Sequence, residues 1–204
     1  GPGTIAPLDP SRAQAPLSYR LPEHGVAIDF EPTDFVQING ALNRAMIARA
    51  LDVLEPQAGA TVLDLFCGLG NFSLPLARRT GQVVAVEGDA GLVQRARGNA
   101  ERNGITNAEF HVADLFKDVS GLPWSQRRYD SVLLDPPRAG AREILPVVAG
   151  SGARRVVYIS CHSGSLARDA GLLVREHGFR LTAAGVMDMF PHTTHVEAMA
   201  VFDR

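Results

Sequence analysis

Apolar runs of strand length alternate along this chain with stretches whose apolar residues recur at helical spacing. The runs predict strands at residues 26–30, 61–66, 82–87, 108–113, 129–135, 154–160, 181–187 and 197–202. The helical stretches predict helices at 39–54, from the turn after 66 to about 79, and at 90–102, 142–148 and 165–176. Apolar strands separated by helices indicate a mostly parallel sheet covered on both faces. The last two strands have no helix between them, which predicts an antiparallel hairpin at the edge of a seven-stranded sheet.

This pattern indicates a single α/β domain of the open, Rossmann-like type, whose ligands lie beyond the carboxyl ends of the strands. The length of 204 residues suits one domain with a full hydrophobic core. Residues 4–24 are rich in Pro, Ala and Ser and have no clear period, so we expect a linker stump there. Gly1-Pro2-Gly3 resembles a protease scar. We therefore expect the domain itself to occupy residues 25–204.

Composition indicates a soluble globular protein. The chain is 46% hydrophobic and 21% charged, it has no apolar run long enough to span a bilayer, and it begins without a signal-peptide pattern. We therefore expect a cytoplasmic protein without a membrane partner. A net charge of −2 provides no basic field, so composition alone does not identify RNA as a partner. Arg127-Arg128 and Arg154-Arg155 could contact phosphate or could be solvated surface.

The two cysteines, Cys67 and Cys161, cannot form a disulfide framework or a four-cysteine metal or cluster site. We expect both thiols to be free. His192 and His195, together with Cys161 or Glu197, could imitate a metal site. Their spacing matches no common zinc pattern, so we expect no metal.

A glycine-containing turn after the strand at 61–66 is the first candidate for chemistry. Gly68 and Gly70 would let the backbone approach a ligand, and Glu87 ends the next strand, where a carboxylate can accept both hydroxyls of a ribose. The third glycine of the dinucleotide fingerprint is missing, and Asp64 puts negative charge where a pyrophosphate would lie. The turn therefore suits a sulfonium amino acid joined to adenosine. The alternative is a tight turn without a ligand.

Two further acids end predicted strands. Asp114 could meet an adenine edge or could be a helix cap for the residues from Leu115 onward. Asp135 begins the run Asp-Pro-Pro-Arg, in which the prolines stiffen the chain and fix the direction of the carboxylate. Amino-group methyltransferases carry an aromatic residue after such prolines, and Arg138 in that place argues against their chemistry.

Cys161 and Glu197 are the candidates for catalysis. Cys161 follows a strand and precedes a helix, whose dipole favours a thiolate, although a structural cysteine is a common alternative. Glu197 begins an otherwise apolar strand, and burying an unpaired carboxylate there is energetically costly, which indicates a function. A general base facing a cleft is one such function.

Linked motifs in this chain resemble those of the RNA 5-methyluridine methyltransferases, and the branch that acts on 23S ribosomal RNA is the most similar. They are Asp-Leu-Phe-Cys-Gly-Leu-Gly-Asn at 64–71, Leu-Asp-Pro-Pro-Arg-Ala-Gly at 134–140, Ser160-Cys161 with Leu-Ala-Arg-Asp at 166–169, and Asp-Met-Phe-Pro-His at 188–192 with His-Val-Glu at 195–197. The similarity runs from about Leu17 to Arg204. It implies a class I S-adenosylmethionine-dependent methyltransferase that acts as a monomer on RNA.

The resemblance also implies roles for particular residues. S-adenosylmethionine would be bound by Gln37, Phe66, Gly68, Asn71, Glu87, Asp114 and Asp135. The Cys161 thiolate would add to C6 of uracil, and Glu197 would remove the C5 proton after methyl transfer.

The chain departs from the family pattern in two ways. His162-Ser163 stands where the family usually has Asn-Pro. The upstream RNA-binding barrel of the family, with its four-cysteine iron–sulfur site, has no counterpart in these residues, so we expect a truncated catalytic domain. An RNA 5-methylcytosine enzyme is a rival, but it would carry a second Cys in the motif at 135–138. A non-catalytic module that binds S-adenosylmethionine or RNA is the other rival.

Overall fold

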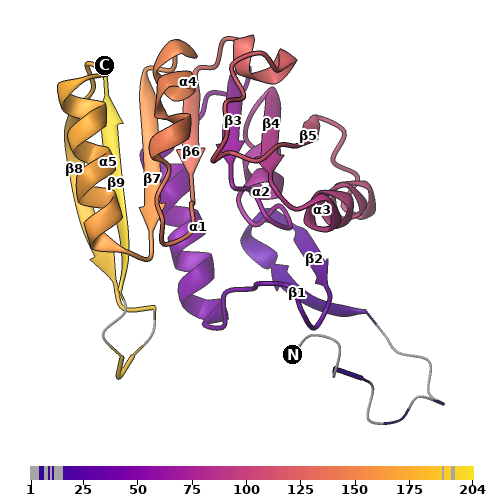
Figure 1. Cartoon of the computed structure of the whole chain (residues 1–204). Helices are drawn as coiled ribbons and strands as arrows, with labels where there is room; N and C mark the ends of the chain where they lie inside the picture. Colours follow the sequence, from indigo (N-terminus) through magenta and orange to yellow (C-terminus); the bar gives the residue numbers. More distant parts are fainter. Residues whose placement is uncertain (1–4, 7–8, 10, 12–15, 190, 194–195) are drawn as a thin grey trace.

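The computed structural model describes residues 5–6, 9, 11, 16–189, 191–193 and 196–204, and its centre is a seven-stranded sheet (Figure 1). The strands lie in the order β5-β4-β3-β6-β7-β9-β8. Their bounds are β3 Thr61–Leu65, β4 Gln82–Glu87, β5 Ala108–Val112, β6 Ser131–Leu134, β7 Arg155–Ser160, β8 Arg180–Met187 and β9 Glu197–Asp203. The helices are α1 Gly40–Leu54, α2 Ser73–Ala77, α3 Ala90–Arg102, α4 Leu145–Gly150 and α5 Ser163–Arg175. None of the described helices is long and apolar enough to cross a membrane.

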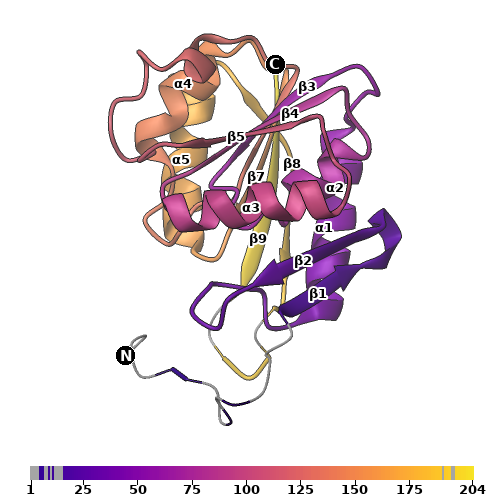
Figure 2. The same ribbon diagram turned by 90° about the vertical axis from the view of Figure 1, so that its right-hand side faces the viewer.

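Helices cover both faces of the sheet, as the apolar strands predict (Figure 2). Successive residues of a strand point to opposite faces. In β3, Val62 packs with the cores of α1, α2 and α3, whereas Leu63 and Leu65 pack with those of α4 and α5. The strands β3, β4, β5, β6 and β7 pair in parallel, so their carboxyl ends meet at one edge.

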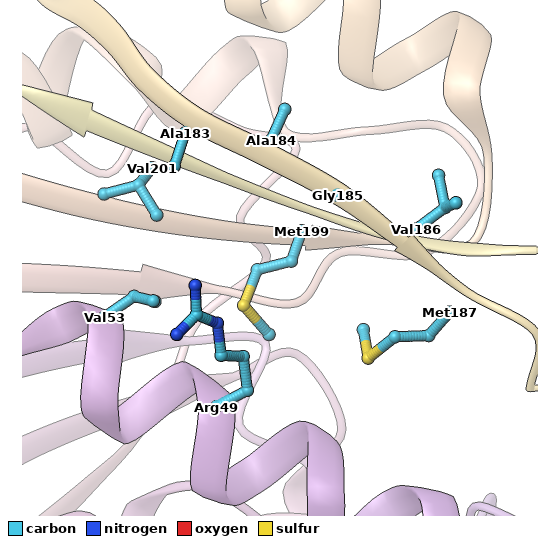
Figure 3. A pocket seen from close by; sticks show the side chains of 9 residues that line it. All are labelled: Arg49, Val53, Ala183, Ala184, Gly185, Val186, Met187, Met199 and Val201. Carbon is cyan, nitrogen blue, oxygen red and sulfur yellow. The ribbon is translucent and has the colours of Figure 1, made fainter.

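The predicted antiparallel hairpin is confirmed. β9 lies between β7 and β8 and pairs antiparallel with both. β8 is the edge strand, and α1 reaches β7 and β9 but leaves much of β8 open, with Val186 74% exposed. Figure 3 shows the shallow groove that results between Arg49 of α1 and the methionines Met187 and Met199 of the hairpin.

The expectation of a linker stump at residues 4–24 is wrong for Leu17–Leu21. These residues form β1, which pairs antiparallel with β2 (Val26–Phe30) in a separate two-stranded sheet. Leu17, Tyr19 and Leu21 alternate with Ser18 and Arg20, but the alternation covers only five residues next to a stretch rich in Pro and Ala, so it does not stand out in the sequence. The strand is held by its pairing with β2 and by the core contacts of Leu21 and Tyr19.

Two asparagines of α3 attach this small sheet to the main domain. The Asn103 amide donates to Ala27 O at 2.7 Å, and its Oδ1 accepts from Ala27 N at 2.8 Å. Asn99 makes the same pair of bonds with Asp29, at 3.1 and 2.8 Å, and also donates to Leu69 O at 3.3 Å. Their spacing of i and i+4 places both amides on one face of the helix. They make the hydrogen bonds to β2 that a neighbouring strand would otherwise make.

We predict that Asn99→Ala lowers the free energy of unfolding by about 1–3 kcal/mol, because it leaves partly buried backbone groups of Asp29 without partners. Denaturant unfolding should show this loss, and hydrogen exchange should show reduced protection of the Asp29 amide. Glu101→Ala is the matched control, because Glu101 is an exposed residue of the same helix. Equal stability of the two variants would contradict the role assigned to Asn99.

Candidate active site

A cavity of about 600 Å³ opens at the carboxyl ends of the parallel strands. All nine residues proposed from the sequence line it: Gln37, Phe66, Gly68, Asn71, Glu87, Asp114, Asp135, Cys161 and Glu197. Other residues that the sequence did not indicate also line the cavity, among them Tyr19, Phe35, Leu92 and Phe116. Tyr19 lies on the unpredicted strand β1, and an aromatic residue two positions after Asp114 is the one signal by which Phe116 could have been found.

The turn after β3 forms one wall of the cavity. Phe66 has a φ of 65°, and Gly68 and Gly70 have φ of 54° and 91°. The positive φ of Gly70 favours glycine, and a Cβ there would also make a tight contact of 3.1 Å with Cγ of Leu74. The amides of Phe66 and Cys67 both donate to Val86 O, which fastens the turn to β4.

The Glu87 carboxylate is held in a fixed direction by backbone amides. Its Oε2 accepts from Gly68 N at 3.1 Å, and its Oε1 accepts from Gly88 N at 2.7 Å and Asp89 N at 3.1 Å. A carboxylate has about four lone-pair sites and three are used here, so Oε2 can still accept from a hydroxyl group in the cavity. This geometry suits a ribose hydroxyl.

Asp114 lines the cavity and closes a turn; no helix begins at Leu115, so the alternative of a helix cap is wrong. Its Oδ1 accepts from Phe116 N at 3.1 Å, and its Oδ2 pairs with Lys117 at 3.1 Å. The turn brings the Phe116 ring towards Phe66, with centroids 5.8 Å apart and planes at 52°. An apolar wall therefore lies beside an exposed carboxylate, an arrangement that suits a heteroaromatic base with amino groups at its edge.

Asn71 connects the cavity wall to two other elements. Its Oδ1 accepts from Tyr19 Oη at 2.9 Å and from the Asn43 amide at 3.0 Å, and its own amide donates to Asn43 Oδ1 at 3.0 Å. Most of its hydrogen-bonding capacity is thus used within the protein. Asn71 holds β1 and α1 against the glycine turn, and one amide hydrogen is left for a ligand.

The loop before α1 carries Gln37 and is held by α3. Arg95 pairs with Asp34 at 2.5 Å and with Glu31 at 3.5 Å. The Gln37 Oε1 atom is buried and has no hydrogen-bond partner among the described residues. A buried acceptor without a partner is costly, so this atom is suited to receive a donor from a ligand.

Acidic groups beneath the cavity share one electrostatic environment. Asp64 is fully buried and accepts from Ser73 Oγ at 2.5 Å, while its Oδ1 has no described partner. Burial raises the pKa of Asp64 to about 7. Burial, Glu197 and Asp64 raise the pKa of Asp135 to about 8. The site therefore favours a ligand that carries positive charge, because a nearby cation lowers the cost of ionising these carboxyls.

Cys161 and Glu197 come together through the pairing of β7 with β9. Ser160 pairs with Ala198, so Cys161 and Glu197 are the next positions beyond the last paired residues. Burial raises the pKa of Glu197. Burial, Glu197 and Asp135 also raise the pKa of Cys161, so the net effect is opposite to the one expected from the helix dipole alone. His162 caps α5 by accepting from Ser165 N at 3.1 Å.

Cys67 differs from Cys161 in its environment. It is 4% exposed and packs in the core cluster with α1, α2 and α3, although its edge reaches the cavity. Burial raises the pKa of its thiol well above the ordinary value, so the ionised form is disfavoured. Among the described residues no group of three or more His, Cys, Asp or Glu side chains could hold a metal ion. His195, one of the residues that could imitate a metal site, lies outside the described residues.

The parallel sheet, the glycine turn and the acid at the end of β4 define a class I S-adenosylmethionine-dependent methyltransferase domain. The lining of the cavity fits that cofactor. Glu87 can accept from a ribose hydroxyl, the Phe66–Phe116 wall can contact adenine, and the acceptor atoms of Gln37 and Asp64 without described partners suit a cationic ligand. The family model for tRNA (Uracil-5-)-methyltransferase matches residues 19–204. The chain belongs to this family.

Individual relatives agree with this assignment. The chain is 58% identical over all of its 204 residues to the 23S rRNA (uracil(1939)-C(5))-methyltransferase RlmD of Stenotrophomonas maltophilia, and it covers 46% of that protein. It is 60% identical over 188 residues, 92% of its length, to the RlmD of Alkalilimnicola ehrlichii, of which it covers 42%. The chain thus spans about half the length of the curated relatives it matches.

Among solved structures, the tRNA (uracil-54, C5)-methyltransferase of Pyrococcus abyssi in complex with S-adenosyl-L-homocysteine has a TM-score of 0.79 and 29% sequence identity. The alignment covers 94% of this chain and 45% of that one. The TYW2 protein of M. jannaschii in complex with AdoMet has a TM-score of 0.69 at 17% identity, over 95% of this chain and 88% of that one, which shows the shared fold.

We predict a pH dependence of stability that arises from Asp64. Because its pKa is raised from 3.8 to about 7 in the folded chain, the folded state holds a proton that the unfolded state releases. Stability should therefore fall as the pH rises from about 4 to about 7. Asp64→Asn should reduce this slope and raise the free energy of unfolding at pH 8 by on the order of a few kcal/mol.

Denaturant unfolding at a series of pH values measures this effect. Glu176→Gln is the control, because Glu176 is an exposed carboxylate at the end of α5. If the free energy of unfolding depends on pH equally in Asp64→Asn and in the unmodified chain, the ionisation of Asp64 is not the cause of the loss of stability.

Proposed function

We propose that this chain is the catalytic domain of an enzyme that methylates C5 of a uridine in RNA, with 23S ribosomal RNA as the substrate class. The observation that carries the proposal is the meeting of Cys161 and Glu197 at one edge of a cavity that suits S-adenosylmethionine. The names of the relatives with which the chain shares 55–60% identity support the choice of base and RNA. S-adenosylmethionine supplies the methyl group and would be held by Gln37, Phe66, Gly68, Glu87, Asp114 and Asp135, with Asn71 beside them.

Cys161 makes C5 reactive. C5 of uracil is a poor nucleophile, and addition of the Cys161 thiolate to C6 turns the ring into an enolate that is electron-rich at C5. The raised pKa of Cys161 keeps the thiol protonated in the absence of ligand. A cationic ligand near Asp135 and Glu197 would offset the charge of these groups and favour the thiolate.

Glu197 completes the reaction. After methylation C5 still holds its proton, and the Glu197 carboxylate removes it, so that the S–C6 bond breaks and the aromatic ring returns. Glu197 is 3% exposed, and its raised pKa makes it a stronger base than an exposed carboxylate. The uridine must leave its stack to reach these groups, and the exposed Arg138 at the rim can meet the RNA backbone as it does so.

The first test uses an RNA that contains 5-fluorouridine. Fluorine at C5 cannot leave as a proton, so incubation with S-adenosylmethionine should trap the methylated base on the enzyme, and mass spectrometry should map the adduct to Cys161. Cys161→Ala should abolish the adduct, and Cys67→Ala should retain it. Binding of S-adenosylmethionine and of the RNA is measured in parallel. Binding of both without an adduct would instead indicate a non-catalytic module.

The second test separates the roles of the two residues. Glu197→Gln is expected to accumulate a methylated covalent complex with ordinary uridine RNA, because the proton on C5 has no acceptor. Product formation should fall by about 10²–10⁴-fold, the usual contribution of a general base. Denaturing gel shift with labelled RNA measures the complex. Loss of both complex and product would mean that Glu197 acts before methyl transfer, contrary to the proposal.

A further inference from the structure

We propose that Asp169 is a positioning residue that sets the loop after β6, and with it Asp135 and Arg138, relative to Cys161. The motif that contains Asp169 has no part in the chemistry proposed above. Asp169 lies in the middle of α5, it is fully buried, and it does not line the cavity. The inference rests on the proposed function only for its bearing on catalysis.

The contacts of Asp169 lead to the backbone of this loop. Its Oδ2 accepts from the backbone N–H of Ala141 at 2.7 Å and from Tyr158 Oη at 2.7 Å. Its Oδ1 accepts from Arg168 at 2.7 Å, and Arg168 in turn donates to Ala139 O at 2.8 Å. The Asp169–Arg168 pair therefore binds both the N–H of Ala141 and the C=O of Ala139 at the end of the loop.

Gly140 allows the loop to pack closely against Arg168 and Asp169. Its φ is 85°, and a Cβ there would lie 2.5 Å from Nη2 of Arg168 and 2.6 Å from Oδ2 of Asp169. Gly140 N donates to Pro137 O at 2.8 Å, which closes the loop into a turn. Conformation and space together allow only glycine between Ala139 and Ala141.

The same helix also carries the Cys161 side of the cavity. α5 begins directly after His162, whose side chain caps it, and Asp169 lies about two turns further on. Tyr158 belongs to β7, the strand that ends before Cys161. One carboxylate thus joins β7, α5 and the loop after β6, which are the elements that carry Cys161 and Asp135.

Energetics argue for a role beyond packing. A well-packed apolar side chain at a buried helix position is often as stable as a buried charge with its partners or more so. The charged network at Asp169 is satisfied on both oxygens, and such networks fix one arrangement of the groups that they join. Here the fixed arrangement is that of the cavity wall.

The experiment compares Tyr158→Phe with Tyr129→Phe. Each removes one buried 2.7 Å hydrogen bond from a tyrosine hydroxyl, but the bond of Tyr129 goes to Trp124 O, away from the loop. Asp169→Asn is the stronger variant, and the tyrosine pair remains informative if it fails to fold. The readouts are hydrogen exchange of the Ala141 amide and the pH profile of Cys161 alkylation, with peptide mapping to separate it from Cys67.

Tyr158→Phe is expected to speed exchange at Ala141 and to move the midpoint of Cys161 alkylation to lower pH by roughly half a unit, because Asp135 is held less firmly near the thiol. Tyr129→Phe should lose similar stability and change neither readout. Unchanged exchange and an unchanged pH profile in Tyr158→Phe would overturn the proposal and leave a merely structural bond. Neither readout requires methyl transfer, so failure of the proposed function would leave this result standing.

Discussion

The direction in which each strand runs is the constraint on which the site depends. Parallel pairing of β3, β4, β6 and β7 brings the carboxyl ends of these strands to one edge of the sheet. β9 runs in the opposite direction, so it delivers its first residue, Glu197, to the same edge. A parallel strand in that place would put Glu197 at the far end of the sheet. The single antiparallel pairing with β7 therefore allows a thiol and a carboxylate from distant parts of the chain to meet.

Amide side chains extend this arrangement beyond the sheet. Asn99 and Asn103 bind the backbone of β2, and Asn71 and Asn43 bind each other beside Tyr19. An asparagine can donate and accept at once, so it can satisfy the N–H and the C=O of one strand residue that point away from the neighbouring strand. The small sheet is thereby attached to α3 and to the glycine turn, and its Tyr19 becomes part of the cavity wall.

The electrostatics of the cavity favour binding at the expense of stability. Asp64 and Asp135 are held where burial raises the pKa of each, to about 7 and about 8. Apolar side chains in their place would avoid the cost of desolvation. Their presence is explained by a cationic ligand and by a thiol whose ionisation responds to the charges around it. The network around Asp169 has the same character, since it uses buried charge to hold a loop in one position.

Residue patterns alone determined the α/β class, the parallel sheet, the terminal hairpin and the lining residues at strand ends. They could do so because apolar periodicity reports burial, and because the carboxyl ends of parallel strands meet at one edge. Only the tertiary structure decided the rest. Tyr19 of β1 lies in the cavity wall, the pKa of Cys161 depends on carboxylates at the end of β6 and the start of β9, and Asn71 is engaged by Asn43 and Tyr19. These properties arise from contacts between residues far apart in the chain, which leave no local period or spacing in the sequence.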